Sequence, residues 1–104
     1  MLIRDAIPNL GMSVFVAKTI RDKEAEAKAR FSEVFGRALR NARKDNSGPS
    51  QENFANSLGI DRTTISLIER GKQIPNVWTL YRMSKELEIS AGELIAKVES
   101  ELSE

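Results

Sequence analysis

Apolar residues recur at helical spacing along most of the chain. Residues 23–44 are rich in strong helix formers, and their apolar side chains recur three and four residues apart, as on one face of an α-helix. The members of this stripe are Phe31, Val34, Phe35, Ala38, Leu39 and Ala42. The helix should end before Pro49, because Asn46, Ser47 and Gly48 form a breaker cluster and proline disfavours a helical residue before it.

Two shorter helices are predicted next. Ser50 is placed to cap a helix over residues 51–58, and Gly59 should end it. Asp61 is placed to cap a following helix that should stop at Gly71, a residue suited to a left-handed cap. The inward-facing residues of these two helices would be Phe54, Ala55, Leu58, Ile65 and Ile68.

The same spacing predicts two helices beyond the break at residues 74–76. A fourth helix over residues 77–88 should bury Val77, Leu80, Leu87 and either Met83 or Ser84. A fifth helix should open with Ser90 and Glu93, which have the separation of a capping box, and its apolar residues are Leu94, Ile95, Val98 and Leu102. The pattern therefore predicts an all-α fold of about five helices.

The first twenty residues do not fit this helical pattern. Met12, Val14 and Val16 alternate with their neighbours as in a β-strand, after a turn at residues 8–11. We therefore expect residues 1–22 to be an N-terminal extension, either a short strand or an unstructured arm, with a possible role in dimerisation.

Length and composition indicate one domain without enzymatic chemistry. The chain of 104 residues has room for one modest core, so residues 23–104 are expected to form a single helical domain. No apolar run approaches the roughly 20 residues that a membrane span requires, and the N-terminus lacks an export signal, which predicts a cytoplasmic protein without membrane association. The chain has no His and no Cys, so we expect no metal site, no cofactor and no catalytic residue.

Charge is spread unevenly but mildly. Residues 1–30 carry six Lys and Arg against four Asp and Glu, and residues 31–78 carry seven against five, so each segment has a net charge of +2. Residues 79–104 carry three against six, a net charge of −3. An ordinary solvated surface explains an asymmetry of this size, so charge alone does not indicate a function.

The turn at residues 59–61 indicates a helix-turn-helix. The two helices that it joins are too short to be stable alone and too close to lie antiparallel, so they must cross steeply. With Ile65 and Ile68 facing inward, the outer face of the second helix would present Arg62, Thr63, Ser66, Leu67 and Arg70. Arginine can bridge guanine O6 and N7, and threonine suits the thymine methyl, although a solvated helix face is the simpler explanation of these residues taken alone.

A longer motif carries a resemblance to a known family. The stretch SQENFANSLGIDRTTISLIERGKQIPNVWTLYRMSKEL resembles the helix-turn-helix domain of the phage-repressor, or Xre-like, family, and the likeness covers about residues 31–95. It includes the Ser-Gln opening of the second helix, the Leu58-Gly59 turn, and the Ile-Glu-Arg-Gly-Lys ending of the third helix. The resemblance implies a lambda-repressor-like bundle whose third helix enters the major groove of double-stranded DNA, and dimers that read two half-sites.

The resemblance also implies roles for individual residues. The base-reading positions fall on Arg62, Thr63, Ser66 and Leu67, of which Leu67 offers only apolar contact where many relatives have a polar side chain. Phosphate-binding positions are assigned to Ser50, Gln51, Arg70, Lys72 and Asn76. The position of Gln51 agrees with physical expectation, because free N–H groups and the positive end of the helix dipole meet at a helix N-terminus.

The family further pairs an arginine of the first helix with the glutamate before the turn glycine. This pair would be Arg43 and Glu69 here, but the loop at residues 46–49 looks one residue longer than usual, so Arg40 remains an alternative partner. Both arginines would also suit a phosphate contact.

These residues together predict a sequence-specific DNA-binding regulator of transcription. We expect a repressor that binds a near-palindromic operator as a homodimer, and a protein partner remains open. The alternative is an antitoxin that masks a toxin protein and regulates itself through the same domain. Candidate dimer surfaces are the N-terminal strand, the apolar stripe of the fifth helix, and the edge formed by Trp78 and Tyr81, which would otherwise be half-buried packing residues.

Overall fold

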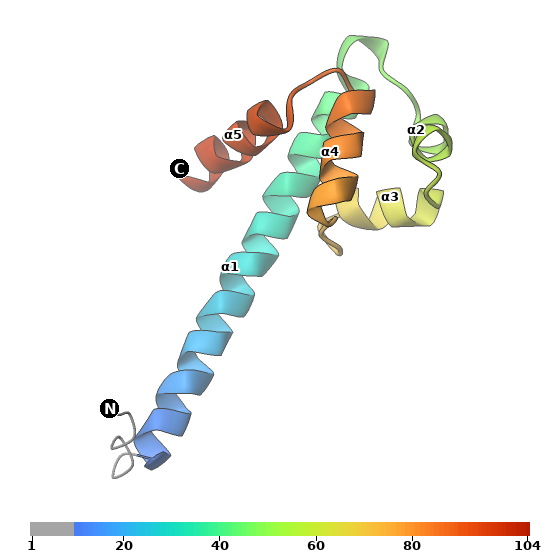
Figure 1. Ribbon diagram of the computed structural model, residues 1–104. Coiled ribbons are helices and arrows are strands. Elements are labelled where there is room, and N and C mark those ends of the chain that lie inside the picture. The colour runs from blue at the N-terminus through green and yellow to red at the C-terminus, as the bar shows by residue number, and fades with distance from the viewer. Residues whose placement is uncertain (1–9) are drawn as a thin grey trace.

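The computed structural model describes residues 10–104, with side chains from Val16 onward except that of Asn46, and contains five α-helices (Figure 1). The helices are α1 (Leu10–Lys44), α2 (Gln51–Leu58), α3 (Arg62–Glu69), α4 (Val77–Glu86) and α5 (Ala91–Leu102), and a short 3-10 turn, η2 (Asp45–Ser47), follows α1. These described residues contain no strand, so the predicted all-α fold is confirmed.

The predicted strand at Met12, Val14 and Val16 is wrong. These residues lie in α1, which begins at Leu10 and not at the predicted position 23. A lone strand would leave its backbone donors and acceptors without partners, whereas a helix pairs them within its own segment. The Ala-, Lys- and Glu-rich sequence that follows also favours extending the helix backwards. The turn predicted at residues 8–11 falls largely outside the described residues.

Side-chain caps set several of the helix ends. Ser50 Oγ accepts a hydrogen bond from the backbone N–H of Asn53 at 3.1 Å, which starts α2 as predicted. Ser90 and Glu93 form the predicted capping box of α5, with hydrogen bonds of 2.9 Å and 3.4 Å. Asp61 occupies the N-cap position of α3, but its side chain makes no capping hydrogen bond.

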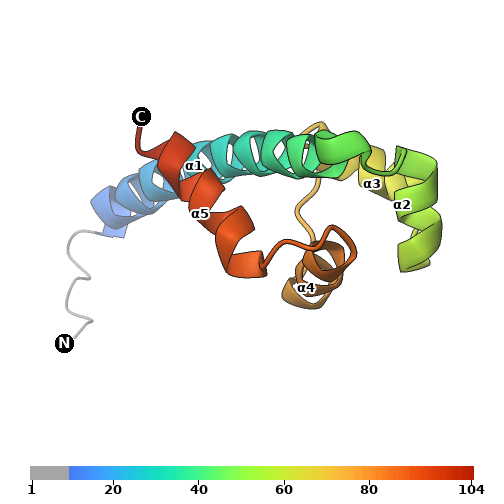
Figure 2. The ribbon, with the colours of Figure 1, turned by 90° about the horizontal axis from the view of Figure 1, so that it is seen from above.

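The core lies where α1 meets the other helices. Figures 1 and 2 show α2 and α3 gathered at the C-terminal end of α1, with α5 crossing α1 and α4 lying between α2 and α5. All five helices contribute buried apolar side chains. These are Val34, Phe35, Leu39, Phe54, Ala55, Leu58, Ile65, Ile68, Met83, Leu94 and Val98.

The start of α4 departs from the prediction. Met83 and Ser84 are both buried, but Val77, which was predicted to be buried, is 81% exposed. Leu80 and Leu87 pack against the core, whereas no helix of the described chain covers the first turn of α4. Helical spacing identifies the side of α4 that faces the core but not where along the helix the core ends.

The N-terminal half of α1 extends well beyond the core. At 35 residues and about 1.5 Å per residue, α1 is about 50 Å long. The molecule accordingly measures 60 × 29 × 21 Å, and its narrow end is this helix (Figure 1). Among residues 10–104, no helix combines the length and the hydropathy needed to cross a bilayer.

Gly36 allows α1 and α3 to approach closely. A Cβ atom at this position would lie 2.5 Å from the carbonyl oxygen of Ile68 and 2.6 Å from that of Glu69. Both contacts are shorter than van der Waals distance and involve backbone atoms, which cannot rotate away. The C-terminal end of α3 therefore rests directly on the backbone of α1, and this contact fixes where α3 lies.

We predict that Gly36→Ala destabilises the protein by about 1–3 kcal/mol, because the added methyl group must push α1 and α3 apart. Gly92→Ala is the matched control, since Gly92 also lies in a helix and the nearest neighbour of an added Cβ is 3.8 Å away. The control should be neutral or should stabilise by up to about 1 kcal/mol. Urea unfolding followed by circular dichroism measures both changes, and equal stability of the two variants would contradict the proposed close contact.

Candidate nucleic-acid interface

The turn between α2 and α3 sets these helices at a steep angle. Gly59 has φ +68°, in the left-handed region that favours glycine. The N–H of Ile60 then donates to the carbonyl oxygen of Ala55 at 3.0 Å, which closes the end of α2. Ile60 packs against the core, so the turn is anchored. Figure 1 looks nearly along α2 while α3 lies across the view, which is the arrangement of a helix-turn-helix.

The two faces of α3 differ sharply in exposure. Ile65 and Ile68 are buried, which fixes the inward direction of the helix. Arg62 and Thr63 are exposed near its N-terminus. The outward surface of α3 therefore begins with a guanidinium and a hydroxyl that a ligand can reach.

The other predicted groove residues are less accessible. Ser66 and Leu67 are half-buried, and the Ser66 hydroxyl accepts a hydrogen bond from Arg70 Nε at 3.2 Å. Arg70 itself is exposed and lies over the same turn of the helix. Ser66 and Arg70, which were predicted to read a base and hold a phosphate respectively, thus form one connected pair.

A glycine ends α3 and directs the chain away. Gly71 has φ +76°, and the N–H groups of Gly71 and Lys72 donate to the carbonyl oxygens of Ile68 and Leu67 at 3.0 Å and 2.8 Å. These two bonds form a Schellman turn. A Cβ at position 71 would also lie 2.9 Å from the Cα of Glu33, so both backbone conformation and space require glycine. The exposed Lys72 side chain follows directly after this turn.

A buried ion pair joins α1 to α3. Arg43 donates two hydrogen bonds to the Glu69 carboxylate, from Nε at 2.6 Å and from Nη2 at 2.9 Å, and both residues are only 7% exposed. Its third nitrogen, Nη1, donates to the carbonyl oxygen of Pro49 at 3.0 Å. Of the two arginines considered from the sequence, Arg43 is therefore the partner of Glu69, and Arg40 is exposed on α1.

Gln51 belongs to the same network. Its Nε2 donates to Glu69 Oε1 at 2.9 Å, so the carboxylate holds the first residue of α2 as well as the end of α1. This contact was not predicted, because the resemblance indicated only a phosphate-binding role for Gln51. The amide has a second N–H, and the first turn of α2 lies beside it, so the two roles are compatible.

Ser50 and Asn76 have structural roles at the N-termini of α2 and α4. Asn76 Oδ1 accepts a hydrogen bond from the N–H of Thr79 at 2.8 Å, as Ser50 does for α2. Their predicted phosphate contacts would therefore use the backbone N–H groups at these helix starts or the remaining side-chain donors.

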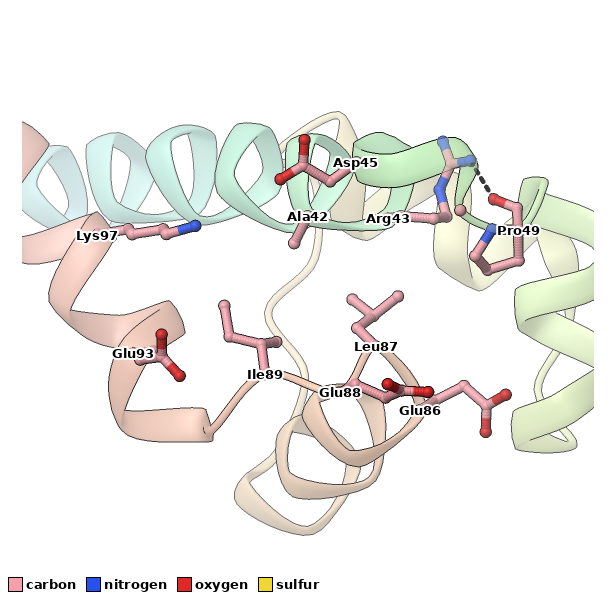
Figure 3. A pocket seen from close by; sticks show the side chains of 11 residues that line it. Ala42, Arg43, Asp45, Pro49, Glu86, Leu87, Glu88, Ile89, Glu93 and Lys97 are labelled. Atoms are coloured by element: carbon pink, nitrogen blue, oxygen red, sulfur yellow. Dashed lines mark hydrogen bonds between the residues drawn. The ribbon is translucent and has the colours of Figure 1, made fainter.

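A hollow whose lining includes several acidic residues lies at the C-terminal end of α4. It has a volume of about 460 Å³ and lies between the end of α1 and the link from α4 to α5 (Figure 3). Four carboxylates line it, those of Asp45, Glu86, Glu88 and Glu93, together with the basic residues Arg43 and Lys97. The excess of carboxylates over basic groups disfavours phosphate binding here. Among the described residues, no group of carboxylates is arranged to hold a metal ion.

Two further contacts that position the helices were not predicted from the sequence. Arg82 Nη2 donates to the carbonyl oxygen of Leu58 at 2.6 Å, which ties α4 to the end of α2. Gly36 permits the contact between α1 and α3 described above. A glycine within a strong helical stripe is a recognisable signal of close packing, whereas nothing in the sequence marks Arg82.

We predict that Glu69→Ala destabilises the protein by about 3–5 kcal/mol, because it leaves the buried Arg43 guanidinium without its counter-charge. Arg37→Ala is the control, since Arg37 and Glu101 form an exposed ion pair. The hydrogen bond and the charge of Glu101 raise the pKa of Arg37, but solvent screens this pair and its loss should change stability little. Thermal and urea unfolding measure both variants, and a loss at Glu69 no larger than that at Arg37 would rule out the anchoring role.

Comparison with known proteins supports this geometry. Residues 36–100 match a family described as a helix-turn-helix domain. The chain is 39% identical over 67 residues to the control protein C.MunI of Mycoplasma sp, an alignment covering 64% of this chain and 90% of that protein. It is 40% identical over 63 residues to the HTH-type transcriptional regulator YazB of Bacillus subtilis (strain 168), covering 61% of this chain and 90% of the relative.

A solved structure is also similar. The restriction-modification controller protein C.AhdI of Aeromonas hydrophila superposes with a TM-score of 0.56 at 31% sequence identity, covering 60% of this chain and 92% of the controller. The matched residues include all of α2, α3 and α4 and the network that positions them. The chain therefore belongs to the helix-turn-helix domain family, as an Xre-like DNA-binding member.

Proposed function

We propose that this protein is a sequence-specific repressor of transcription that binds a near-palindromic operator as a homodimer. The observation that carries the proposal is the exposed face of α3, where Arg62 and Thr63 stand clear of the core. The Arg43 and Glu69 network holds this helix in place without using its outward side chains. Arg62 and Thr63, with Ser66 and Leu67, would read base edges in the major groove.

The surroundings of α3 suit the DNA backbone. Lys72 and Arg70 add positive charge at its C-terminal end, and both are exposed. The start of α2 at Ser50 and Gln51 and the start of α4 at Asn76 offer helix N-termini, which favour phosphate oxygens. The hollow lined by Asp45, Glu86, Glu88 and Glu93 lies at the C-terminal end of α4, whereas Asn76 lies at the N-terminal end of that helix.

The relatives suggest which operators to test first. One relative is named as a control protein, another as a transcriptional regulator, and the similar structure as a restriction-modification controller. We infer that the operator lies in front of a small set of genes regulated together, and a restriction-modification gene pair is the first candidate.

Selection from a random pool of duplex DNA, followed by binding titrations, tests the reading role. We expect Arg62→Ala to weaken binding to the selected sequence by about 1–3 kcal/mol and to bind random DNA almost normally, because a base contact carries the discrimination. Lys72→Ala is the comparison: it should weaken binding to both DNAs and reduce the dependence of log K on log salt by about one. Equal losses by Arg62→Ala on both DNAs would refute the base contact.

An exposed apolar patch on α4 supports the dimer. Val77, Trp78 and Tyr81 are 81%, 64% and 47% exposed, and the two rings stack with centroids 6.0 Å apart. Trp78 is therefore not the half-buried packing residue considered above. A hollow of about 560 Å³ beside Tyr81 extends the patch, with Ile89 and Ala91 in its lining. Such aromatic patches are typical of protein interfaces.

The other two candidate dimer surfaces receive less support. Leu94 and Val98 of the C-terminal stripe are fully buried in the core of their own chain. The N-terminal strand is not formed, because its residues belong to α1. We therefore propose that two copies meet through the patch of Val77, Trp78 and Tyr81. Reading two half-sites one helical turn apart requires their α3 helices to lie about 34 Å apart along DNA.

Trp78→Ala should weaken dimerisation by at least about 2 kcal/mol, the loss expected for a central aromatic contact. Val16→Ala is the control, since Val16 is a comparably exposed apolar residue far from α4, and it should leave the dimer unchanged. Sedimentation equilibrium over a concentration series measures both dissociation constants. A wild-type protein that remains monomeric at high micromolar concentration would contradict the dimer, and an unaffected Trp78→Ala dimer would contradict this surface.

A further inference from the structure

The outward side of α3 carries a second arginine besides Arg62. Thr63 and Arg70 lie seven residues apart, about two helical turns, so they project from the same side of the helix. Both are exposed, and this side lies opposite the buried Ile65 and Ile68. Arg70 therefore projects from the surface that faces DNA in the proposed function, on which this inference rests.

The Arg70 side chain is turned back along α3. Its backbone N–H donates to the carbonyl oxygen of Ser66 at 3.0 Å, and its Nε donates to Ser66 Oγ at 3.2 Å. Residues four positions apart lie one above the other on a helix, and helical side chains point towards the N-terminus. The guanidinium is therefore held over the middle of α3 and not over the turn at Gly71 and Lys72.

The outer nitrogens of this guanidinium are available to a ligand. Within the part of the chain that the structure describes, neither Nη1 nor Nη2 of Arg70 has a hydrogen-bond or ion-pair partner. The buried Arg43, by contrast, uses all of its side-chain nitrogens inside the protein. With Nε held by Ser66, the other two nitrogens of Arg70 form a planar pair of donors, which matches the O6 and N7 acceptors of guanine.

The second half of α3 otherwise offers little for hydrogen bonding to a base. Leu67 has no polar group in its side chain, and the Ser66 hydroxyl is half-buried and already accepts a hydrogen bond from Arg70. Base edges are read by the residues towards the start of a recognition helix. By turning back, Arg70 carries its donors about one helical turn in that direction.

We propose that Arg70 reads a guanine in the major groove and that Ser66 is the positioning residue that orients it. This exchanges the roles that the family resemblance implies, in which Ser66 reads a base and Arg70 holds a phosphate. A phosphate contact fits less well, because the hydrogen bond to Ser66 holds the guanidinium over the helix face that points into the groove. The second half of α3 then adds a guanine preference to the reading by Arg62 and Thr63.

A charge-conserving variant separates a base contact from a phosphate contact. Selection from random duplex DNA with the wild-type protein gives the consensus, and single changes of each base pair then measure every preference. Arg70→Lys keeps the charge but loses the planar fork, so it should lose about tenfold of the preference for one guanine and bind random DNA as the wild type does. An Arg70→Lys variant with wild-type preferences would reduce Arg70 to a phosphate contact and overturn the proposal.

Arg30→Lys is the matched control for this substitution. Arg30 is an exposed arginine of α1 outside the family match, so its replacement should leave every base preference unchanged. Thermal unfolding of each variant shows that it is folded under the binding conditions. A wild type that selects no consensus would overturn the proposed function together with this inference, whereas a consensus that Arg70→Lys reads unchanged would overturn this inference alone.

A base analogue tests the acceptor atoms directly. Replacing the implicated guanine by 7-deazaguanine removes the N7 acceptor, so it should weaken binding of the wild type by at least about threefold. Arg70→Lys should bind the modified and unmodified duplexes equally, because it no longer makes the paired contact. Equal weakening of both proteins would place another side chain at this base and would also overturn the proposal.

The positioning role of Ser66 has its own readout. Ser66→Ala should relax the preference at the same base pair, and adding it to Arg70→Lys should cause no further loss, because the two side chains act as one unit. Ser66→Thr keeps the hydroxyl and should retain the preference. A Ser66→Ala variant that keeps the full guanine preference, or whose loss at another base pair adds to that of Arg70→Lys, would overturn this role.

Discussion

The buried ion pair between Arg43 and Glu69 is the interaction on which the placement of α3 depends. A bidentate guanidinium and carboxylate pair has a defined geometry, and burial removes the water that would otherwise weaken it. Through Gln51 and the carbonyl oxygen of Pro49, the same pair also holds the start of α2 and the loop before it. This polar cluster therefore fixes α1, α2 and α3 relative to one another. Such contacts are needed because helices as short as α2 and α3 would not be stable alone.

This arrangement leaves the outward face of α3 free for a ligand. The core holds α3 through Ile65 and Ile68, Gly36 lets its end rest on the backbone of α1, and Glu69 is directed inward. The exposed polar groups near its start are then carried on a rigid support, which is the usual requirement for reading base edges. The exposed α4 patch that we propose for contact with a second copy lies on a different helix.

Much of the fold followed from apolar spacing and capping residues. The short helices α2, α3 and α5 are local structures, and the Ser50 cap and the capping box of Ser90 depend only on neighbouring residues. Long-range facts were harder to predict. The choice between Arg43 and Arg40 depends on how the loop at residues 45–50 closes, and the exposure of Val77 depends on where the core ends.

Two further differences between the predicted and the observed structure also arise from contacts between residues far apart in the sequence. Period-two spacing at Met12, Val14 and Val16 resembles a strand, but the absence of a partner strand among the described residues leaves the helix as the form that satisfies the backbone. The link between Gln51 and Glu69 joins residues 18 positions apart, and no local pattern indicates it. The assignment of groove-reading residues comes from the family resemblance, and the exposure of Arg62 and Thr63 is consistent with it. A complex with DNA tests this assignment.

Chemical-shift mapping of the isotopically labelled protein, titrated with a duplex selected from a random pool, tests the central claim most directly. The account predicts that the largest backbone shifts occur at residues 62–67 of α3, with smaller ones at Ser50, Gln51, Lys72 and Asn76 at the neighbouring helix ends. Residues 16–30 of α1 should remain unshifted. Shifts concentrated in α1 or α5, with residues 62–67 unchanged at saturation, would contradict the assignment of α3 as the DNA-reading helix.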